Sequence, residues 1–413
     1  MTNLSGEQQK VADDLLCLLN QEYKPTGMSY FLETVGGYAG TGKTFLIGEF
    51  RKMLRKQFPH LSILFVTFTG KASGVLKNKL EEQHAIFPND YIGTIHRLIY
   101  KPKTRWDKVL KTFVIIGWET VEDLDGGDLI IIDEASMVSE EIFRDLSKYK
   151  KPIIAFGDHG QLPPIGDNFN LMATPKHTLK EIQRQSLDSP IIALSHFIRQ
   201  NGYIPGNQMF SPEVFKFSWS NKICKKIWEE KLVFDENLII LCAFNTTRAN
   251  LNDKIRERLN FRNRKPYPGE RIVCLANNQD SKIMNGQIGT VIWVMPEDLN
   301  LYRITYQMDG SQDVYESMVS SKCFGEVQYT MYDKSPKIKE QIAYIRTRKF
   351  SSIDFFDYGY SISVHKSQGS EWPKVVVFEQ RTKHWDDNYY ARWLYTAITR
   401  AKEKLFIISD YWG

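Results

Sequence analysis

One loop near the start of this chain has the residue types and spacing of a phosphate-binding site. Residues 37–44 read Gly-Tyr-Ala-Gly-Thr-Gly-Lys-Thr and fill every position of the GxxxxGK[ST] pattern. In such a loop the glycines let backbone N–H groups turn toward phosphates, and the lysine reaches the β and γ groups. The flanks agree, since 31–35 reads as a buried strand and a helical pattern begins at Phe45. The predicted nucleotide-binding residues are Gly37, Gly40, Thr41, Gly42, Lys43 and Thr44, the last with its hydroxyl on Mg²⁺.

Two carboxylates follow a second apolar run and add the groups that a bound triphosphate needs for hydrolysis. Residues 129–132 read as a strand, and Asp133 and Glu134 come directly after it. Phosphoryl transfer requires one group that holds magnesium and another that orients and deprotonates the attacking water. We therefore predict Asp133 as a metal ligand and Glu134 as the catalytic base of an ATP-hydrolysing site.

A third apolar run, at 153–156, leads into a loop of turn-forming residues at 157–164. This loop contains one amide side chain, Gln161, which we predict to contact the γ-phosphate as a sensor. The residues alone leave an alternative open, a surface turn stiffened by Pro163 and Pro164.

Composition limits the kind of protein without deciding its function. Of the 413 residues 42% are hydrophobic and 25% are charged, so the chain can bury two or more cores. Its five cysteines form no CxxC pair, which argues against structural zinc and against a disulfide framework. No apolar stretch is long enough to span a bilayer and the N-terminus lacks signal-peptide regions, so we expect a cytoplasmic protein without a membrane partner. The net charge of +5 is compatible with a polyanionic partner.

Nine short motifs follow one another along most of the chain. They occupy residues 4–8, 37–44, 67–72, 93–96, 133–137, 157–164, 181–185, 364–371 and 394–402. In residue types and order they resemble the motifs of superfamily 1 nucleic-acid helicases, in particular the 5′-to-3′ branch that contains RecD and the phage Dda helicase. The last two motifs are the most specific. One departure is Val364, where relatives commonly carry a hydroxyl residue.

The resemblance implies an α/β fold with two RecA-like parallel-sheet domains in tandem, at 1–178 and 179–413. It also implies a small β-hairpin insert, the pin, at about 97–127, and an SH3-like β insert at about 269–350. The residues themselves favour parallel sheets covered on both faces, because short apolar runs at 238–242, 375–378 and 405–409 alternate with helical patterns. The second insert could instead be a structural β segment without nucleic-acid contacts.

The resemblance further assigns nucleotide contacts outside the loop at 37–44. Arg184 and Arg400 match arginine fingers that would neutralise the γ-phosphate when the two domains close; unmatched arginines would more simply form surface ion pairs. Gln8 matches the glutamine that reads adenine. Gly369 and Glu371 also belong to the nucleotide site on this comparison.

Contacts to nucleic acid are expected from loops at the edges of both sheets. They comprise Thr69, Lys71, Thr94 and His96 in the first domain, and His365 and Lys366 in the second. Hydroxyls, imidazoles and lysines suit phosphates, so binding should be largely indifferent to base sequence, although any one of these side chains could instead be a local cap. In the pin, Trp106, Phe113 and Trp118 offer flat faces for a base, and the sequence does not select one of them.

Together these patterns predict a monomeric, magnesium-dependent ATPase that moves 5′ to 3′ along single-stranded DNA and unwinds duplex junctions, with replication or repair proteins as further partners. Polarity and the preference for DNA come from the resemblance alone. The residues leave open an RNA-directed or 3′-to-5′ helicase, and an ATP-gated clamp that binds nucleic acid without unwinding it.

Overall fold

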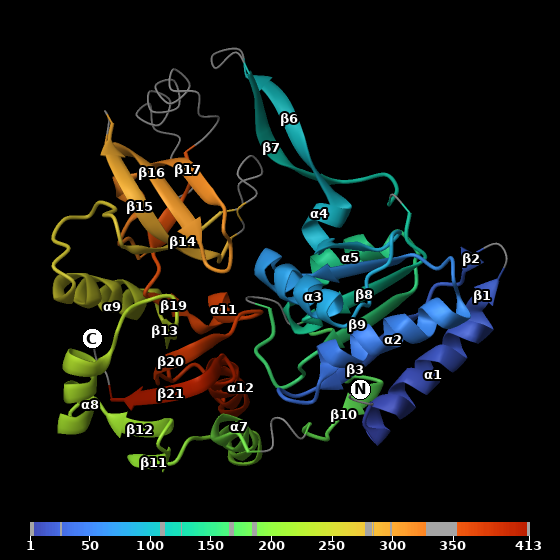
Figure 1. Ribbon diagram of the computed structural model, residues 1–413, viewed down its shortest axis with the longest axis horizontal. Helices are drawn as coiled ribbons and strands as arrows, with labels where there is room; N and C mark the ends of the chain where they lie inside the picture. The colour runs from blue at the N-terminus through green and yellow to red at the C-terminus, as the bar shows by residue number, and fades with distance from the viewer. Residues whose placement is uncertain are drawn as a thin grey trace. The chain divides into compact units, whose positions relative to one another are not determined.

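The chain forms two compact units, Met1–Ala193 and Leu194–Gly413, each with its own sheet (Figure 1). The computed structural model describes residues 4–24, 27–107, 112–124, 126–164, 169–183, 188–276, 283, 285–297, 300–327 and 353–410. The division falls within helix α7 (Pro190–Asn201), whereas the predicted boundary after residue 178 falls within strand β10 (His177–Leu179). The first unit is longer than predicted because β10 pairs with the first sheet. Across the described ranges, no helix combines the length and apolarity that a bilayer-spanning segment needs.

A six-stranded sheet lies at the centre of the first unit, in the order β10-β3-β9-β8-β4-β5, and every neighbouring pair is parallel. Besides β10, its strands are β3 (Leu32–Gly37), β4 (Ile63–Thr67), β5 (Tyr91–Thr94), β8 (Leu129–Asp133) and β9 (Ile153–Gly157). The helices are α1 (Gly6–Glu22), α2 (Lys43–Gln57), α3 (Gly70–Glu82), α4 (Ile95–Ile99), α5 (Glu140–Ser147) and the short η1 (Ala135–Met137). A separate two-stranded ribbon pairs β1 (Tyr23–Lys24) with β2 (Gly27–Met28).

Helices cover both faces of this sheet, which explains why its central strands β4, β8 and β9 are almost entirely apolar. Residues of β8 alternate between two hydrophobic clusters: Ile131 packs with α1, α2 and α3, while Ile130 and Ile132 pack with α4 and α5. Strands buried on both faces are expected in parallel sheets. The carboxyl ends of parallel strands share one edge, so the loops after β3, β4, β5, β8 and β9 lie along the same side of the unit.

The second unit repeats this plan with six strands in the order β11-β12-β21-β20-β13-β19. They are β11 (Gln208–Ser211), β12 (Val214–Ser218), β13 (Leu238–Cys242), β19 (Ser361–Ser363), β20 (Trp372–Phe378) and β21 (Ala401–Ser409). Only the edge strand β11 is antiparallel to its neighbour. The helices after α7 are α8 (Lys222–Lys226), η2 (Ile227–Lys231), α9 (Asn245–Arg258), α11 (Val364–Ser367) and α12 (Asp387–Ile398). The predicted tandem of two parallel-sheet domains is therefore confirmed.

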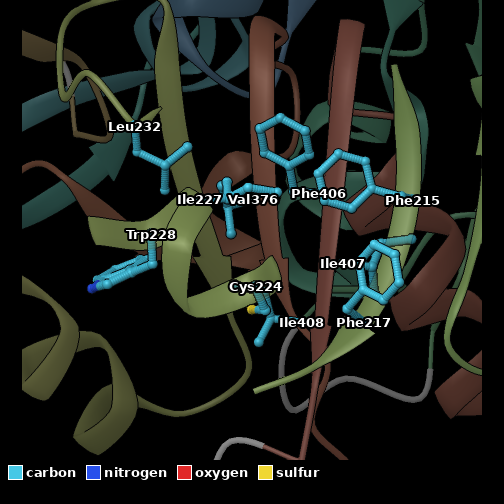
Figure 2. Close-up of a pocket in the computed structure, with 10 residues that line it drawn as sticks. All are labelled: Phe215, Phe217, Cys224, Ile227, Trp228, Leu232, Val376, Phe406, Ile407 and Ile408. Atoms are coloured by element: carbon cyan, nitrogen blue, oxygen red, sulfur yellow. The ribbon is translucent and has the colours of Figure 1, made fainter. Parts of the chain in front are cut away.

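A small apolar pocket lies between α8, η2 and one face of the second sheet (Figure 2). Figure 2 shows ten side chains around it, all of them apolar or cysteine. They are Phe215, Phe217, Cys224, Ile227, Trp228, Leu232, Val376, Phe406, Ile407 and Ile408. Burial raises the pKa of the Cys224 thiol to about 11, so it stays protonated at neutral pH. This pocket is part of the core and has no group that could do chemistry.

The predicted hairpin insert is present in the first unit. Strand β6 (Tyr100–Asp107) pairs antiparallel with β7 (Thr112–Thr120), and the hairpin projects from the α4 end of the unit (Figure 1). Trp118 lies opposite Pro102 and is 53% exposed. Trp106 and Phe113 pair with each other closer to the turn. Of the three pin aromatics, Trp118 therefore has a ring that is available to solvent, while the side chains of the other two lie outside the described set.

The second insert forms a five-stranded antiparallel sheet in the order β17-β16-β15-β14-β18. Its strands are β14 (Arg271–Cys274), β15 (Ile288–Pro296), β16 (Leu301–Met308), β17 (Val314–Ser320) and β18 (Phe356–Tyr358), with the short η3 (Ser321–Cys323) after β17. The predicted turn before β15 is present, and Gly286 adopts a φ of 86° there. The predicted end of the insert, at about residue 350, is too early. The strand β18 comes after it in the sequence but belongs to the insert, because it pairs with β14. The SH3-like description of this sheet remains a prediction.

Helix α9 binds this insert through buried polar side chains. Arg248, Asn252 and Arg256 are spaced four residues apart and are all buried. Arg248 pairs with Asp357, Asn252 Nδ2 donates to the Tyr358 carbonyl at 3.1 Å, and Arg256 Nε donates to Glu270 Oε1 at 2.5 Å. The buried face of α9 therefore combines these polar side chains with apolar ones such as Leu251 and Ile255, so the helix has no purely apolar stripe.

Replacing Arg256 with methionine is expected to destabilise the second unit by about 3–5 kcal/mol, because it leaves a buried carboxylate without its partner. Burial raises the pKa of Glu270 to about 7, and Arg256 opposes that rise. Without Arg256 the folded-state pKa rises further, so stability should fall as the pH increases from the unfolded value of 4.5 through neutrality. Urea unfolding at pH 6 and pH 8 measures both effects.

The matched control for this prediction is Arg264→Met. Arg264 also forms an ion pair, with Glu326 at 2.9 Å, but both side chains are about half exposed. Its loss should change stability by less than about 1 kcal/mol at either pH. Equal, small changes for the two variants would contradict a stabilising role for the buried pair.

Candidate active site

The loop between β3 and α2 has the geometry that its sequence predicts. Gly40 and Gly42 adopt φ angles of 81° and 74°, a region that residues with a Cβ rarely occupy. At Gly42 a Cβ would also lie 2.6 Å from Gln8 Nε2. The Lys43 ammonium donates to the carbonyls of Gly37 and Tyr38, at 2.8 and 3.2 Å, so the lysine folds back along the loop.

Close packing inside the loop accounts for two more of its predicted residues. The Thr41 hydroxyl donates to the Tyr38 carbonyl at 2.8 Å and the side chain is buried. A Cβ at Gly37 would lie 2.6 Å from this hydroxyl oxygen, so only glycine fits there without rearrangement. Thr41 therefore braces the loop from within.

Thr44 and Asp133 meet at the foot of the loop. The Thr44 hydroxyl donates to Asp133 Oδ2 at 3.2 Å, although the two residues are 89 positions apart. Burial raises the pKa of Asp133, while Lys43 and the hydrogen bonds to Glu134 and Thr44 oppose that shift. A hydroxyl and a carboxylate oxygen are hard ligands that suit Mg²⁺, which commonly takes one or two carboxylates together with substrate phosphates and waters. These two residues fit such an ion.

Glu134 has a backbone conformation that is unusual for a residue with a side chain. Its φ and ψ are 56° and 40°, in the left-handed region, and its backbone N–H donates to Asp133 Oδ1 at 3.0 Å. Such a residue costs roughly 1–2 kcal/mol relative to the right-handed region. Strain of this kind clusters at functional sites, where the surrounding structure enforces it. Here it turns the chain sharply from β8 into η1 at Glu134, the second of the two carboxylates.

The loop after β9 is organised around a buried carboxylate. Asp158 is fully buried and accepts hydrogen bonds from the Gly160 N–H at 2.9 Å and from Gln161 Nε2 at 3.4 Å. Gln161 is itself buried, which does not fit the surface-turn alternative. The ring of His159 lies 4.1 Å from that of Tyr38, centroid to centroid, so this loop packs directly on the nucleotide loop. The sequence did not single out that ring pair.

Gln8 and the segment around 181–183 also reach the nucleotide loop. Gln8 completes a capping box at the start of α1 and donates through Nε2 to the Thr41 carbonyl at 3.0 Å. The Gln183 backbone N–H donates to the Gly40 carbonyl at 2.9 Å. Arg184, the first predicted finger, lies outside the described residues. Gln183 was not predicted, because an uncharged side chain beside an arginine gives no separate signal in sequence.

In the second unit, Arg400 lies just after α12 and is only 3% exposed. Its guanidinium donates to the carbonyls of Thr396 and Ser370, at 3.0 and 3.3 Å, and to the Thr399 hydroxyl at 3.1 Å. These acceptors are neutral, so they position the positive charge without cancelling it. The predicted Gly369 and Glu371 flank Ser370, so the structure brings these three predicted residues to one place. Glu371 is exposed there and faces Lys402 at 3.6 Å.

The predicted nucleic-acid residues of the first unit lie at or just after the ends of β4 and β5. These two parallel strands end side by side, with Thr67 of β4 opposite Thr94 of β5. The hydroxyls of Thr69 and Thr94 accept backbone N–H groups at the starts of α3 and α4, each at 3.2 Å, so both are helix caps. A capping hydroxyl still carries a proton that it can donate to a phosphate. Exposed His96 lies between the rings of Phe68 and Tyr100, and Lys71 is half-buried nearby in α3.

An aromatic cluster that the sequence analysis missed surrounds His365 in the second unit. His365 Nε2 is hydrogen-bonded to the Tyr389 hydroxyl at 3.0 Å, and the Tyr389 ring lies 4.9 Å from that of Trp385. Phe244, at the end of β13, lies 5.9 Å from Trp385. Burial lowers the pKa of His365, so it is neutral at pH 7. The available signal was the pair of aromatic residues Trp385 and Tyr389 at the start of a predicted motif-bearing helix region, four residues apart. Lys366 is exposed. Val364, which stands where relatives commonly carry a hydroxyl residue, is buried in the core.

Comparison with known proteins places both units in described sequence families. Residues 25–206 match the family described as an AAA domain, and residues 358–408 match the UvrD-like helicase C-terminal domain. The chain is 23% identical over 425 residues to the ATP-dependent DNA helicase Pif1 of Campylobacter jejuni, covering 89% of this chain and 86% of that protein. It is 24% identical over 307 residues to the ATP-dependent RecD2 DNA helicase of Deinococcus radiodurans, covering 68% and 36%.

The fold is also similar to that of a solved Pif1 helicase from Bacteroides, crystallised with ADP-AlF3 and ssDNA. The TM-score is 0.54 at 18% identity, covering 100% of this chain and 94% of that one. In sequence and in fold the chain therefore resembles the superfamily 1B helicases. The resemblance carried by the nine motifs is thus confirmed. The chain spans about a third of the length of the first three curated relatives that it matches, namely 36, 33 and 36%.

Proposed function

We propose that this chain is an ATP- and Mg²⁺-dependent helicase that moves 5′ to 3′ along single-stranded DNA and unwinds duplex DNA. The observation that carries the proposal is the meeting of Lys43, Thr44 and Asp133 at the sheet edge that also presents Thr69 and Thr94. A nucleotide site and hydroxyl donors suited to a phosphate backbone then share the carboxyl ends of one parallel sheet.

In this proposal each of the predicted site residues would have a separate role in ATP hydrolysis. Thr44 and Asp133 would hold the metal ion, which would neutralise charge on the phosphates. Lys43 would bind the β- and γ-phosphates, and Glu134 would take a proton from the attacking water. Gln161 would sense the γ-phosphate from the adjoining loop. Arg400, and Arg184 from outside the described residues, would supply the finger charges.

Single-stranded DNA would contact both units mainly through its phosphates. Thr69, Lys71, Thr94 and His96 would bind it in the first unit, and His365 and Lys366 in the second. The cluster of Phe244, Trp385 and Tyr389 beside His365 offers rings for stacking, which accepts every base. Binding should therefore depend weakly on sequence and weaken as salt rises.

The hairpin offers a means of holding separated bases apart. Opening one base pair costs about 1.4 kcal/mol of stacking, and an aromatic platform returns about 1–3 kcal/mol per base. Among the three pin aromatics, the ring of Trp118 is exposed and flanked on the neighbouring strand by Pro102. We assign Trp118 this role.

A strand-displacement assay tests direction and substrate together. Labelled duplexes with a 5′ or a 3′ single-stranded tail, in DNA and in RNA, are offered to the chain with ATP and Mg²⁺. We expect release from the 5′-tailed DNA duplex. Strand release only from the 3′-tailed duplexes would support a 3′-to-5′ helicase. Strand release only from the RNA duplexes would support an RNA-directed helicase. An ATP-gated clamp would displace no strand from any of these duplexes. The time that it takes to reach a labelled end of single-stranded DNA would not depend on the length of the strand.

Replacing Glu134 with glutamine is expected to slow ATP hydrolysis by about 10²–10⁴-fold while ATP still binds, because only the water-activating base is lost. Single-turnover hydrolysis and equilibrium ATP binding measure the two effects. Glu140→Gln, at an exposed position on the following helix, is the matched control and should keep the parent rate. A fall of less than about tenfold in Glu134→Gln would remove Glu134 from the catalytic role.

A further inference from the structure

Helix α5 holds both strands of the hairpin at the point where they leave the first unit. The hydroxyl of Tyr100, the first residue of β6, donates to Asp145 Oδ2 of α5 at 2.6 Å. The hydroxyl of Tyr149, just beyond α5, donates at 2.8 Å to the carbonyl of Val121, which directly follows β7. Two phenol hydroxyls therefore connect one helix to both ends of the hairpin.

The Tyr100 hydrogen bond is the stronger of the two because its acceptor is a charged, buried carboxylate. Asp145 is 8% exposed, and its other oxygen accepts from the Lys148 ammonium at 2.7 Å. The hydrogen bonds from Lys148 and Tyr100 lower the pKa of Asp145, so it is ionised at neutral pH. Burial and the bond to Asp145 raise the pKa of Tyr100, so its hydroxyl keeps the proton that it donates. Hydrogen bonds of this kind are roughly twice as strong as those between neutral groups.

The hairpin depends on these contacts because β6 and β7 pair only with each other in the part of the chain that the structure describes. A two-stranded ribbon by itself is only marginally stable, and it has no larger sheet to fix its direction. Tyr100, Val121 and Tyr149 also pack against the apolar cluster between the sheet and α4 and α5. The direction of the hairpin relative to the sheet is thus set where its two ends meet α5 (Figure 1).

The same helix begins next to the carboxylates of the candidate active site. Strand β8 ends at Asp133, and Glu134 leads directly into η1. The Ser139 hydroxyl then caps α5 by accepting from the Ile142 N–H at 3.4 Å. Helix α5 therefore starts near the edge of the sheet that carries the site and ends at the base of the hairpin. If that base does not pivot, the hairpin moves with the sheet as one rigid part.

We propose that Tyr100, Asp145 and Tyr149 are positioning residues for strand separation, which fix the hairpin so that movement of the first unit drives it against a DNA duplex. Their two hydrogen bonds resist the force that the duplex exerts on the hairpin. Both tyrosine hydroxyls are engaged at the base of the hairpin, so ATP hydrolysis at the loop of residues 37–44 should proceed without them. The inference rests on the proposed function, because it requires that the chain unwinds duplex DNA.

Strand displacement and ATP hydrolysis by the full chain, measured on the tailed duplex that the parent displaces, test the proposal. The quantity measured is the number of base pairs displaced per ATP hydrolysed. Tyr100→Phe removes only a hydroxyl and keeps the ring beside His96, so this number should fall by about threefold or more. Tyr100→Phe combined with Tyr149→Phe removes both hydrogen bonds, and the number should fall by about tenfold or more. The rate of ATP hydrolysis on single-stranded DNA should stay close to that of the parent in both variants.

Tyr91→Phe is the matched control. Tyr91 lies in β5 of the same unit and packs against the same apolar cluster, and its buried hydroxyl has no hydrogen-bond partner among the described residues. Loss of this hydroxyl should leave the number of base pairs displaced per ATP unchanged. Thermal unfolding shows which variants are folded, and if the double variant is not, Tyr100→Phe decides.

The outcomes separate this inference from the proposed function. If the folded variants displace as many base pairs per ATP as the parent, the positioning role is overturned and the helicase activity stands. A parallel fall in displacement and hydrolysis also overturns it, because the hydroxyls would then only stabilise the unit as a whole. A parent chain that hydrolyses ATP but displaces no strand contradicts the proposed function itself, and the inference falls with it.

Discussion

Replacing Lys43 with alanine is expected to lower the rate of ATP hydrolysis by more than about 10³-fold. Binding of single-stranded DNA in the absence of nucleotide should stay largely intact. The Lys43 ammonium is held by the carbonyls of Gly37 and Tyr38 within the loop whose last residue, Thr44, meets Asp133. In the proposed function its charge would neutralise negative charge that grows on the phosphates during transfer, and alanine supplies none. The steady-state rate, with and without single-stranded DNA, measures the effect.

Lys52→Ala is the matched control for this prediction. Lys52 lies on the same helix, and its ammonium pairs with Glu49 at 2.6 Å near the surface. Exposed pairs contribute little, so its rate should stay within about twofold of the parent. DNA binding and thermal unfolding show whether the loop stays folded in Lys43→Ala. A Lys43→Ala chain that keeps DNA-stimulated turnover would contradict the proposed site.

The parallel sheets were predictable because their central strands, such as β8 and β13, are short and almost entirely apolar. β13 was predicted with its observed bounds of Leu238–Cys242, and β8 was predicted at 129–132, one residue short of its observed end at Asp133. Once strands are parallel, their carboxyl ends share an edge, so motifs far apart in sequence converge without further information. This is why Thr44 and Asp133 could be paired from sequence alone.

Contacts that depend on neutral or locally unremarkable residues could not be predicted. Gln183 touches the loop through its backbone, and backbone hydrogen bonds leave no trace in residue type. The contact between the tilted rings of His159 and Tyr38 joins two loops that are far apart in the sequence, so no local pattern indicates it. In both cases the tertiary structure, rather than a local pattern, brings the groups together.

Helix α9 and strand β18 show how tertiary pairing overrides local pattern. The polar face of α9 suggests exposure to water, yet Arg248 and Arg256 are buried because Asp357 and Glu270 lie opposite them. β18 has three residues, too few to show any alternation, and it exists because β14 pairs with it. The extent of the insert was therefore not readable from its own residues.

Replacing Arg400 with alanine is expected to lower the rate of ATP hydrolysis by a factor on the order of 10³ or more, with little change in ATP binding. The guanidinium is almost fully buried, and its hydrogen-bond acceptors in the described part of the chain are neutral oxygens, those of Thr396, Thr399 and Ser370. A buried positive charge is unfavourable unless an anion approaches it. In the proposed function the γ-phosphate would be such an anion when the two units close on ATP, and the charge that Arg400 meets would be greatest in the transition state.

Two further variants separate this finger role from a structural one. Arg392→Ala, earlier on the same helix α12, removes a guanidinium that is only half-buried and should leave the rate near that of the parent. Arg400→Lys keeps a positive charge but loses the planar fork, so it should recover part of the rate at most. If the fingers act only in transfer, single-turnover rates fall while the ATP Kd does not move. If the hydrolysis rate of folded Arg400→Ala falls by less than about tenfold, the finger role is contradicted. Arg400 would then have a structural role, holding α12 to the segment around Ser370.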